Sequence, residues 1–195
     1  MNMKRILLTI IITAAAISAY AQPRAAGLRL GVCGFEASYQ HTMNKNQFVE
    51  GNLGLDFGYG AQGSPGIRAT GIYNFIWAQP AWTNQGSWAL YAGPGVTLGY
   101  VNDQVHYKVG NEVPNFLDNG FMFGICGQVG LEYTFWFPLQ LSVDLRPAIG
   151  FHVNNGIRYV DPISHVKSDR YGSRVGFYDN GLLGFSPTIS VRYRF

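Results

Sequence analysis

The chain carries few charged residues, and it has no long apolar run after residue 21. Lys, Arg, Asp and Glu form 13% of its 195 residues, about half of the ~25% that is usual in soluble domains. The formal net charge is +3, from 14 basic and 11 acidic residues, and it falls to +1 without Lys4 and Arg5. Nucleic-acid-binding domains carry a clear excess of positive charge. We therefore expect no nucleic-acid partner.

The sequence also lacks the motifs of common enzyme and metal sites. Its four histidines, His41, His106, His152 and His165, show no metal-ligand spacing such as His-Glu-x-x-His. No phosphate loop or nucleotide fingerprint is present. We therefore expect no metal, no cofactor and no enzymatic activity, and we treat an enzyme below as an alternative.

The first 21 residues have the features of a cleaved signal peptide. Lys4 and Arg5 form a basic start, residues 6–17 are apolar, and Ala19-Tyr20-Ala21 supplies the small-x-small pattern before the cleavage point. A helix needs ~18 or more apolar residues to cross a bilayer, and this run is shorter. We expect residues 1–21 to be removed and residues 22–195 to form one exported domain.

Apolar and polar residues alternate along most of the remaining chain, which is the pattern of half-buried β-strands. At the C-terminus, for example, Ile189, Val191 and Tyr193 alternate with Ser190 and Arg192. Aromatic residues reach 15% of the chain, and there are 25 glycines. The alternation predicts strands at residues 26–32, 35–42, 48–59, 67–77, 88–101, 121–135, 139–152 and 183–195.

An even number of strands places both chain ends on one side of a closed barrel. Residues 102–119 and 153–181 then form long outer loops, and residues 83–86 and 136–138 form short periplasmic turns. We predict an all-β fold, an eight-stranded antiparallel up-and-down transmembrane β-barrel. The sequence does not decide whether a first hairpin forms, because residues 27–40 also fit one continuous strand.

The residue types on the polar strand face indicate which face meets lipid. A water-exposed strand face is normally rich in long charged side chains, yet all four lysines lie outside the predicted strands. Small residues and balanced charges suit a narrow lumen in which charges must pair. We predict a lumen charge network of Arg29, Glu36, Glu50, Asp56, Arg68, Glu132, Asp144, Arg146, Arg192 and Arg194. The alternative is a soluble barrel whose polar face is solvated.

Aromatic residues gather near both ends of the predicted apolar face, as in the girdles of membrane barrels. The periplasmic girdle is expected to contain Phe48, Trp77, Trp88, Phe135, Trp136, Phe137, Tyr193 and Phe195, and the outer girdle Tyr59, Tyr100, Phe121 and Phe151.

Prolines interrupt three predicted strands, at Pro94, Pro147 and Pro187. Proline cannot donate to a strand ladder, so we expect bulges or strand ends at these positions.

The two cysteines, Cys33 and Cys126, are both predicted to face the lumen. Strand spacing in an eight-stranded barrel puts their strands about 14 Å apart. A disulfide needs Cα atoms within ~7 Å, so we expect two free thiols.

The ending Ser190-Val191-Arg192-Tyr193-Arg194-Phe195 resembles the last strand of outer-membrane barrels, whose terminal aromatic residue is recognised by the barrel-assembly machinery. Residues 127–133 and 138–147 resemble the preceding hairpin of small eight-stranded barrels of the OmpX and OmpA membrane-domain type. The resemblance covers the last three strands well and the upstream strands loosely. It implies an outer-membrane location, Tyr193 and Phe195 as the assembly signal, and membrane lipid, lipopolysaccharide and the assembly machinery as partners. It implies no particular activity.

The function we expect is structural or surface-interacting, in a monomer whose outer loops form the contact surface. The long loop at residues 153–181 mixes charges with tyrosines, which suits carbohydrate, lipopolysaccharide or an extracellular protein ligand. The predicted contact residues are Arg158, Tyr159, Asp161, Lys167, Arg170, Tyr171 and Arg174.

Two alternatives remain open, a lipid-A-modifying enzyme and a narrow small-solute pore. In the enzyme, His152 at the outer rim would act as a general base beside the neighbouring loop, which carries Asp161, Ser164, His165 and Asp169. The His-x-Ser pattern of one such barrel deacylase is absent. In the pore, small solutes would pass through the lumen. Charged side chains that fill the lumen would obstruct this passage.

Overall fold

The structure is a computed structural model that describes residues 24–31, 34–57, 65–106, 115–153, 159–160, 167–168, 175–178 and 187–195. The regular structure in these residues is β. No helix in this part of the chain is long and apolar enough to cross a membrane. The predicted signal peptide lies outside the described residues. The strands are β1 (Arg24–Gly31), β2 (Gly34–Asn44), β3 (Gln47–Asp56), β4 (Gly66–Ala78), β5 (Ser87–His106), β6 (Asn115–Thr134), β7 (Leu139–Leu145), β8 (Ala148–Val153), β9 (Tyr159–Val160), β10 (Lys167–Ser168), β11 (Val175–Tyr178) and β12 (Thr188–Arg194).

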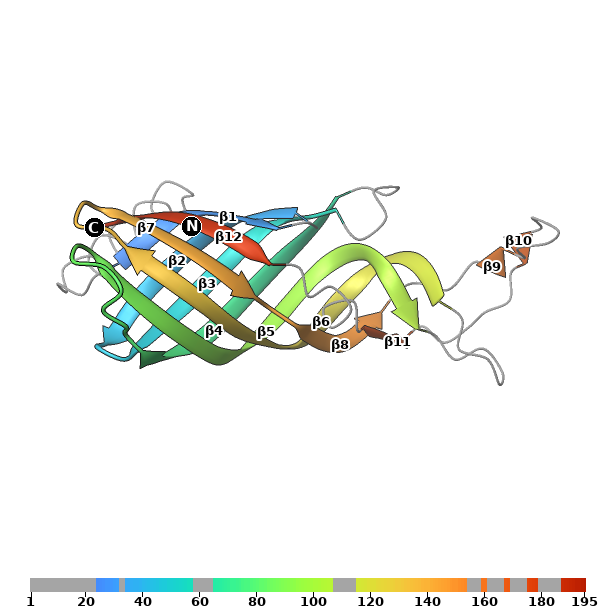
Figure 1. Cartoon of the computed structure of the whole chain (residues 1–195). Helices are drawn as coiled ribbons and strands as arrows, with labels where there is room; N and C mark the ends of the chain where they lie inside the picture. Colours follow the sequence, from blue (N-terminus) through green and yellow to red (C-terminus); the bar gives the residue numbers. More distant parts are fainter. Residues whose placement is uncertain are drawn as a thin grey trace, which may run out of the picture.

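The strands close into one antiparallel barrel (Figure 1). Each of β1 to β6 pairs with the next strand in sequence, and β6 then pairs with β7 and β8 in succession. β12 pairs with both β7 and β1, which closes the barrel. Because β7 continues into β8, and β11 lies beside β8 as β12 lies beside β7, the barrel has eight strands. This confirms the predicted all-β, eight-stranded, up-and-down architecture.

The first hairpin, which the sequence left open, is formed by two strands. β1 and β2 pair from Arg24↔His41 to Gly31↔Gly34, so the chain reverses direction between Gly31 and Gly34. The strand count is therefore even. Arg24 N donates to Phe195 O at 3.1 Å, which places the first and last described residues at one end of the barrel.

The two ends of the barrel differ. The turn end, as we call it, holds Arg24, Phe195 and the short connections at residues 45–46, 79–86 and 135–138. Gly86 directly precedes β5 there and has a φ of +75°, a conformation that favours glycine. The opposite end is called the loop end. β5 and β6 are each 20 residues long and extend beyond the other strands at the loop end (Figure 1).

The three prolines behave differently from one another. Pro147 falls in the break between β7 and β8, and Pro187 directly precedes β12, as expected for strand ends. The predicted bulge or strand end at Pro94 is wrong, because Pro94 pairs with Gly127 inside β5 without a register shift. The β4–β5 ladder instead lacks the pairs between Ile72↔Gly95 and Phe75↔Ala92 and keeps its register across that gap. Proline lacks the N–H that a ladder pair at this point would use.

β11 and β12 lie beside β8 and β7 and keep the same facing. Tyr178 pairs with Gly150 and Thr188 pairs with Asp144. Thr188 is therefore ten residues after Tyr178 in the sequence, whereas their partners Asp144 and Gly150 are six residues apart, a difference of four. An even difference keeps the same alternate residues facing inward in β11 and β12.

The remaining two strands, β9 and β10, pair only with each other, through Lys167↔Val160 and Ser168↔Tyr159. They belong to the long segment that connects β8 to β11.

Candidate functional site: a charged lumen inside an apolar wall

The inward-facing positions of the barrel carry most of its described charged side chains. Along β2, β3 and β4 these are the even-numbered residues, because side chains alternate between the two faces of a strand. All ten predicted network residues lie on described strands or at the β7–β8 break. Nearly all of them are buried, and Arg68 and Arg194 are partly exposed.

Arg146 bridges two carboxylates in the centre of the lumen. Its Nη1 lies 3.1 Å from Glu36 Oε2 and its Nη2 lies 2.9 Å from Glu50 Oε1. The same Glu50 oxygen is 3.1 Å from Arg192 Nη2. The exposed fraction of the Glu50 side chain is 0%, so this carboxylate depends on its two guanidinium partners.

Two further arginines extend the network toward the loop end. Arg29 contacts Glu36 at 2.8 Å and also pairs with Asp144. Arg68 lies 2.8 Å from Asp56 and 3.6 Å from Glu36. Glu36 therefore has three arginine partners, from β1, β4 and the β7–β8 break.

Neutral polar side chains complete the contacts of the charged groups. Arg192 donates from Nε to Ser38 Oγ at 2.8 Å and from Nη1 to Ser142 Oγ at 2.9 Å. Gln40 Nε2 donates to Glu132 Oε2 at 3.2 Å. The structure thus brings eight predicted residues into one ion-paired set, while Glu132 and Arg194 form no ion pair with any described residue.

Aromatic side chains also enter the lumen, and this corrects one prediction. Phe48 was expected in the periplasmic girdle, but it faces inward and is only 4% exposed. Its ring packs edge-on against Tyr91, with centroids 5.2 Å apart. Tyr91 was not singled out from the sequence. The missed signal is parity, because Phe48 shares the even numbering of Glu50 and Asn52 on β3.

Two buried apolar side chains lie near His152 toward the loop end of the lumen. Val101 and Met122 are fully buried there, and Met122 pairs with His152 across β6 and β8. The His152 ring is 0% exposed, and its Nε2 lies 3.4 Å from Val101 O. The prediction placed His152 at the outer rim; the structure places it near the end of β8 and buries its ring inside the barrel. The loop residues Asp161, Ser164, His165 and Asp169 lie outside the described part of the chain.

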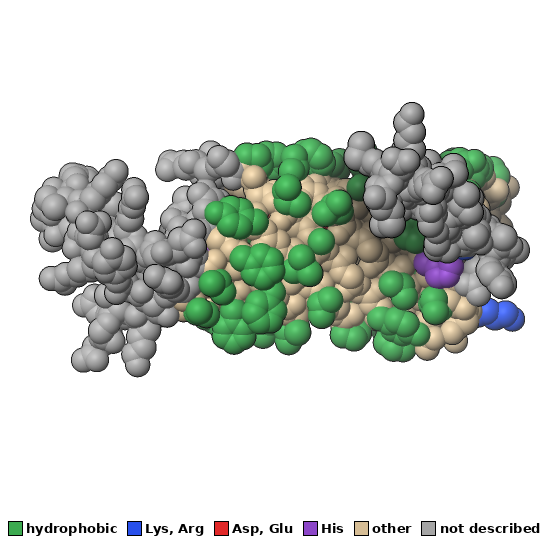
Figure 2. Space-filling model, turned by 180° about the vertical axis from the view of Figure 1, so that it is seen from behind, with side chains coloured by type: hydrophobic (Ala, Val, Ile, Leu, Met, Phe, Trp, Pro, Cys, Tyr) green, Lys and Arg blue, Asp and Glu red, His purple; other side chains and the backbone are tan. Residues whose placement is uncertain are grey.

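The outward-facing positions form an apolar wall. Large hydrophobic side chains are exposed on every barrel strand, for example Leu53 on β3, Val96 on β5 and Ile125 on β6. Figure 2 shows these side chains spread over one face of the barrel, with no Lys, Arg, Asp or Glu side chain among them in its middle part. A water-soluble protein rarely exposes so large a continuous apolar surface.

Aromatic rings concentrate at both ends of this wall. At the turn end, Tyr133 contacts Trp88 and Phe135 with ring centroids 4.6 Å apart in each pair. Tyr133 also donates through its hydroxyl to Gln85 O at 2.7 Å. At the loop end, Phe151 packs against Phe123 and Phe177. The remaining described girdle residues are partly or fully exposed (Trp77, Tyr100, Phe121, Trp136, Phe137, Tyr193 and Phe195), and Tyr59 lies outside the described residues.

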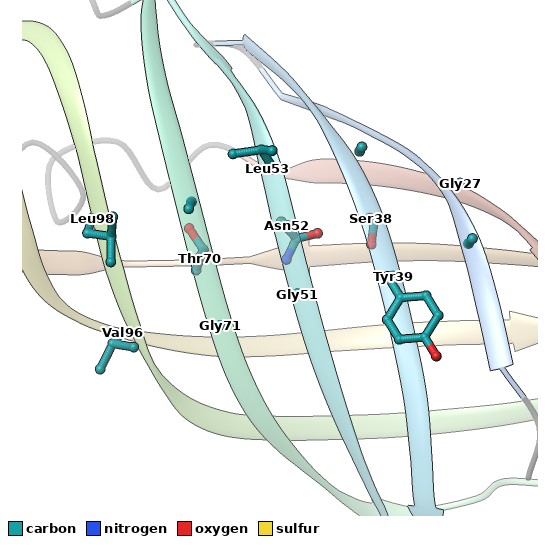
Figure 3. A pocket seen from close by; sticks show the side chains of 13 residues that line it. Gly27, Ser38, Tyr39, Gly51, Asn52, Leu53, Thr70, Gly71, Val96 and Leu98 are labelled. Carbon is teal, nitrogen blue, oxygen red and sulfur yellow. The ribbon is translucent and has the colours of Figure 1, made fainter. Parts of the chain in front are cut away.

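A shallow groove of about 620 Å³ lies on the outward side of β1 to β5. Gly51 and Gly71 form its floor, and they pair directly with each other across β3 and β4. Tyr39, Leu53 and Val96 surround the two glycines (Figure 3). A Cβ atom at either glycine would meet nothing within 4 Å, so the wall is hollowed at this point.

The other predicted sites are placed only in part. Tyr159 and Lys167 lie on β9 and β10, whereas the remaining loop-contact residues, Arg158, Asp161, Arg170, Tyr171 and Arg174, lie outside the described residues. Cys126 has a free, buried thiol. Cys33 lies outside the described residues. No group of three His, Cys, Asp or Glu residues that would hold a metal occurs in the described ranges.

The comparison with known proteins found similarity in structure and no match by sequence. No family model matches the chain, and no curated protein matches it. Among solved structures, the N-terminal β-barrel domain of Pseudomonas aeruginosa OprF is similar, with a TM-score of 0.45 and 10% sequence identity, over 89% of this chain and 96% of that one.

Proposed function

We propose that this protein is an integral outer-membrane β-barrel with a structural or surface-interaction role. The observation that carries the proposal is the orientation of its side chains. Arginines and carboxylates pair with one another inside the barrel, and Leu, Val, Ile and aromatic side chains cover the outside. A closed barrel leaves no strand edge unpaired, which is a requirement for crossing lipid with β-strands.

The ends of the barrel support an orientation in the membrane. Aromatic rings lie at both ends of the apolar wall, where the lipid headgroups would be. The longest connection, from β8 to β11, lies at the loop end, and long outer connections are typical of outer-membrane barrels. In this proposal the turn end faces the periplasm, and the loop end faces the outside.

The path to the membrane is also part of the proposal. Residues 1–21 act as the cleaved signal peptide, and Tyr193 and Phe195 form the assembly signal. Both side chains project from the outside of the turn end, where a partner protein would reach them during assembly. Lipid and lipopolysaccharide are the lasting partners, and the barrel acts as a monomer.

The outer loops are the proposed contact surface for an external ligand. Tyr159 and Lys167 belong to the β9–β10 pair within the long connection after β8. The burial of His152 supports this role over a lipid-A-modifying enzyme, because its ring has no exposed surface at which a lipid substrate could reach it. The ion pairs that cross the lumen support it over a pore.

The first test is whether the purified protein migrates differently on a gel before and after boiling in detergent. A closed membrane barrel resists detergent until heated, so the migration should shift. Unchanged migration would contradict the proposal. Lipid A mass spectra with and without the protein, and with His152→Ala, test the enzyme, and conductance in a planar bilayer tests the pore. We expect no change in acyl pattern and no stepwise current.

A further inference from the structure

A pocket of about 170 Å³ opens at the turn end of the lumen, beyond the last ion pair of the network. Exposed Lys45 and half-buried Arg194 lie at its mouth. Deeper in the pocket lie the buried side chains of Gln40, Glu132 and Gln140, and that of Arg24, which has a partner of its own. The volume is several times the ~30 Å³ that one water molecule occupies in the liquid. A small organic molecule would therefore fit.

Three charged side chains that form no ion pair among the described residues line this pocket. Glu132 is 8% exposed and is the one lumen carboxylate, among those whose side chains the structure describes, that forms no ion pair. Among the cations whose side chains the structure describes, Lys45 and Arg194 likewise form no ion pair. Arg24 also lines the pocket but is not free. A buried carboxylate that forms no ion pair is costly even when amides donate to it, so an arrangement of this kind favours a ligand that supplies a cation.

A second observation points to the kind of group that would bind near Glu132. Gln140 Nε2 donates to Gln40 Oε1 at 2.8 Å, and Gln40 Nε2 donates to Glu132. These bonds fix the direction of both amides and leave Gln140 Oε1 buried without a donor. The inner part of the pocket therefore presents two acceptors, a carboxylate and an amide oxygen, which suit an ammonium group.

The mouth presents the opposite chemistry. Lys45 and Arg194 carry only donors, and Arg194 offers the planar fork that matches a carboxylate. We propose that the pocket binds a small zwitterion of the α-amino acid class. Its ammonium contacts Glu132 and Gln140 Oε1, and its carboxylate contacts Lys45 and Arg194. The inference needs only the closed barrel, so its failure would leave the proposed membrane role untouched.

The test is an NMR titration of the purified protein in detergent micelles with L-alanine as the probe. Two analogues each remove one charge: N-acetyl-L-alanine lacks the ammonium, and L-alanine methyl ester lacks the carboxylate. We expect saturable shifts of the amides of Glu132, Thr134 and Gln140 with L-alanine. Binding of each analogue should be weaker by about tenfold or more. Equal binding of all three compounds, or no saturable shift in the folded protein, would overturn the proposal.

Variants separate the pocket from the barrel as a whole. Glu132→Gln keeps the shape of the side chain and should weaken L-alanine binding by about tenfold, and Gln140→Ala should weaken it several-fold. Asp56→Asn is the matched control, because it removes a lumen carboxylate that pairs with Arg68 at the far end of the lumen. It should leave the affinity unchanged. Unchanged affinity for L-alanine in Glu132→Gln would contradict the proposed contact between Glu132 and the ammonium group, provided that the variant still shows heat-modifiable migration.

Discussion

Arg146 and Glu50 meet across the full width of the barrel, with Nη2 of Arg146 2.9 Å from Oε1 of Glu50. Arg146 lies at the β7–β8 break, and Glu50 lies on β3, four strands away in either direction around the barrel. Their contact ties opposite walls together. The lumen at this level is therefore occupied by paired side chains, which fits an eight-stranded barrel.

This contact makes Glu50 a sensitive position. Replacing Glu50 by Ala leaves Arg146 and Arg192 partly unpaired in a buried site, and we expect a loss of about 3–5 kcal/mol in the free energy of unfolding. Urea unfolding in lipid vesicles, followed by gel migration, measures the change. Leu53→Ala on the outward side of the same strand is the control and should cost clearly less. Equal losses in the two variants would show that the lumen contacts do not stabilise the barrel.

The apolar wall predicts a cost for charge that depends on depth. Val143 is exposed near the middle of β7, and Tyr193 is exposed at the turn end. In vesicles, Val143→Arg should destabilise the barrel by about 2–4 kcal/mol, and Tyr193→Arg by about 0–1 kcal/mol. The difference in urea midpoint gives the comparison. A soluble barrel would show little cost at either position.

The paired glycines in the outer groove predict which glycines tolerate a side chain. A Cβ at Gly51 meets nothing within 4 Å, whereas a Cβ at Gly93 would lie 1.9 Å from Tyr73 O. Gly51→Ala should therefore be neutral or stabilising by up to about 1 kcal/mol. Gly93→Ala should destabilise by about 1–3 kcal/mol, because the β4–β5 pair must shift. Thermal unfolding of the two variants measures the change in stability. A larger loss of stability in Gly51→Ala than in Gly93→Ala would contradict the hollow at Gly51.

Barrel closure can be tested by a cross-link between the first and last strands. Leu28 pairs directly with Val191, and paired Cα atoms of antiparallel strands lie ~4.5–5.5 Å apart, within disulfide range. With Cys33 and Cys126 replaced by Ser, Leu28→Cys with Val191→Cys should oxidise readily in the folded protein. Leu28→Cys with Tyr193→Cys is displaced by two residues and should react less. Preferential cross-linking of the displaced pair would show a different register.

Much of this fold follows from period-two alternation, which gives each strand one apolar and one polar face, while the residue types on the polar face indicated that it lines the lumen. Arg29, Glu36 and Glu50 could be assigned to one lumen on that basis, and the even strand count followed from the spacing of the turns. The end of β1 was ambiguous because Gly31 and Gly34 flank a reversal too short to break the alternation visibly.

Two wrong predictions have a common cause. Each relied on the type of the residue and not on its place in the alternating pattern of its strand. Phe48 was assigned to lipid because it is aromatic, although its even number places it beside Glu50. Pro94 was expected to break its strand, yet β5 keeps its pairing with β6 there. The burial of His152 was not foreseen, because its neighbours Val101 and Met122 come from other strands of the barrel.

The most direct test of the account compares two adjacent residues of β6. Ile125 is 63% exposed on the outer wall, and Cys126 is buried in the lumen. A spin label on Ile125→Cys, with Cys33 and Cys126 replaced by Ser, should lie at mid-depth of the bilayer in reconstituted vesicles. It should then collide with oxygen far more often than with a water-soluble nickel complex. A label at Ile125 that the nickel complex reaches freely would contradict the account.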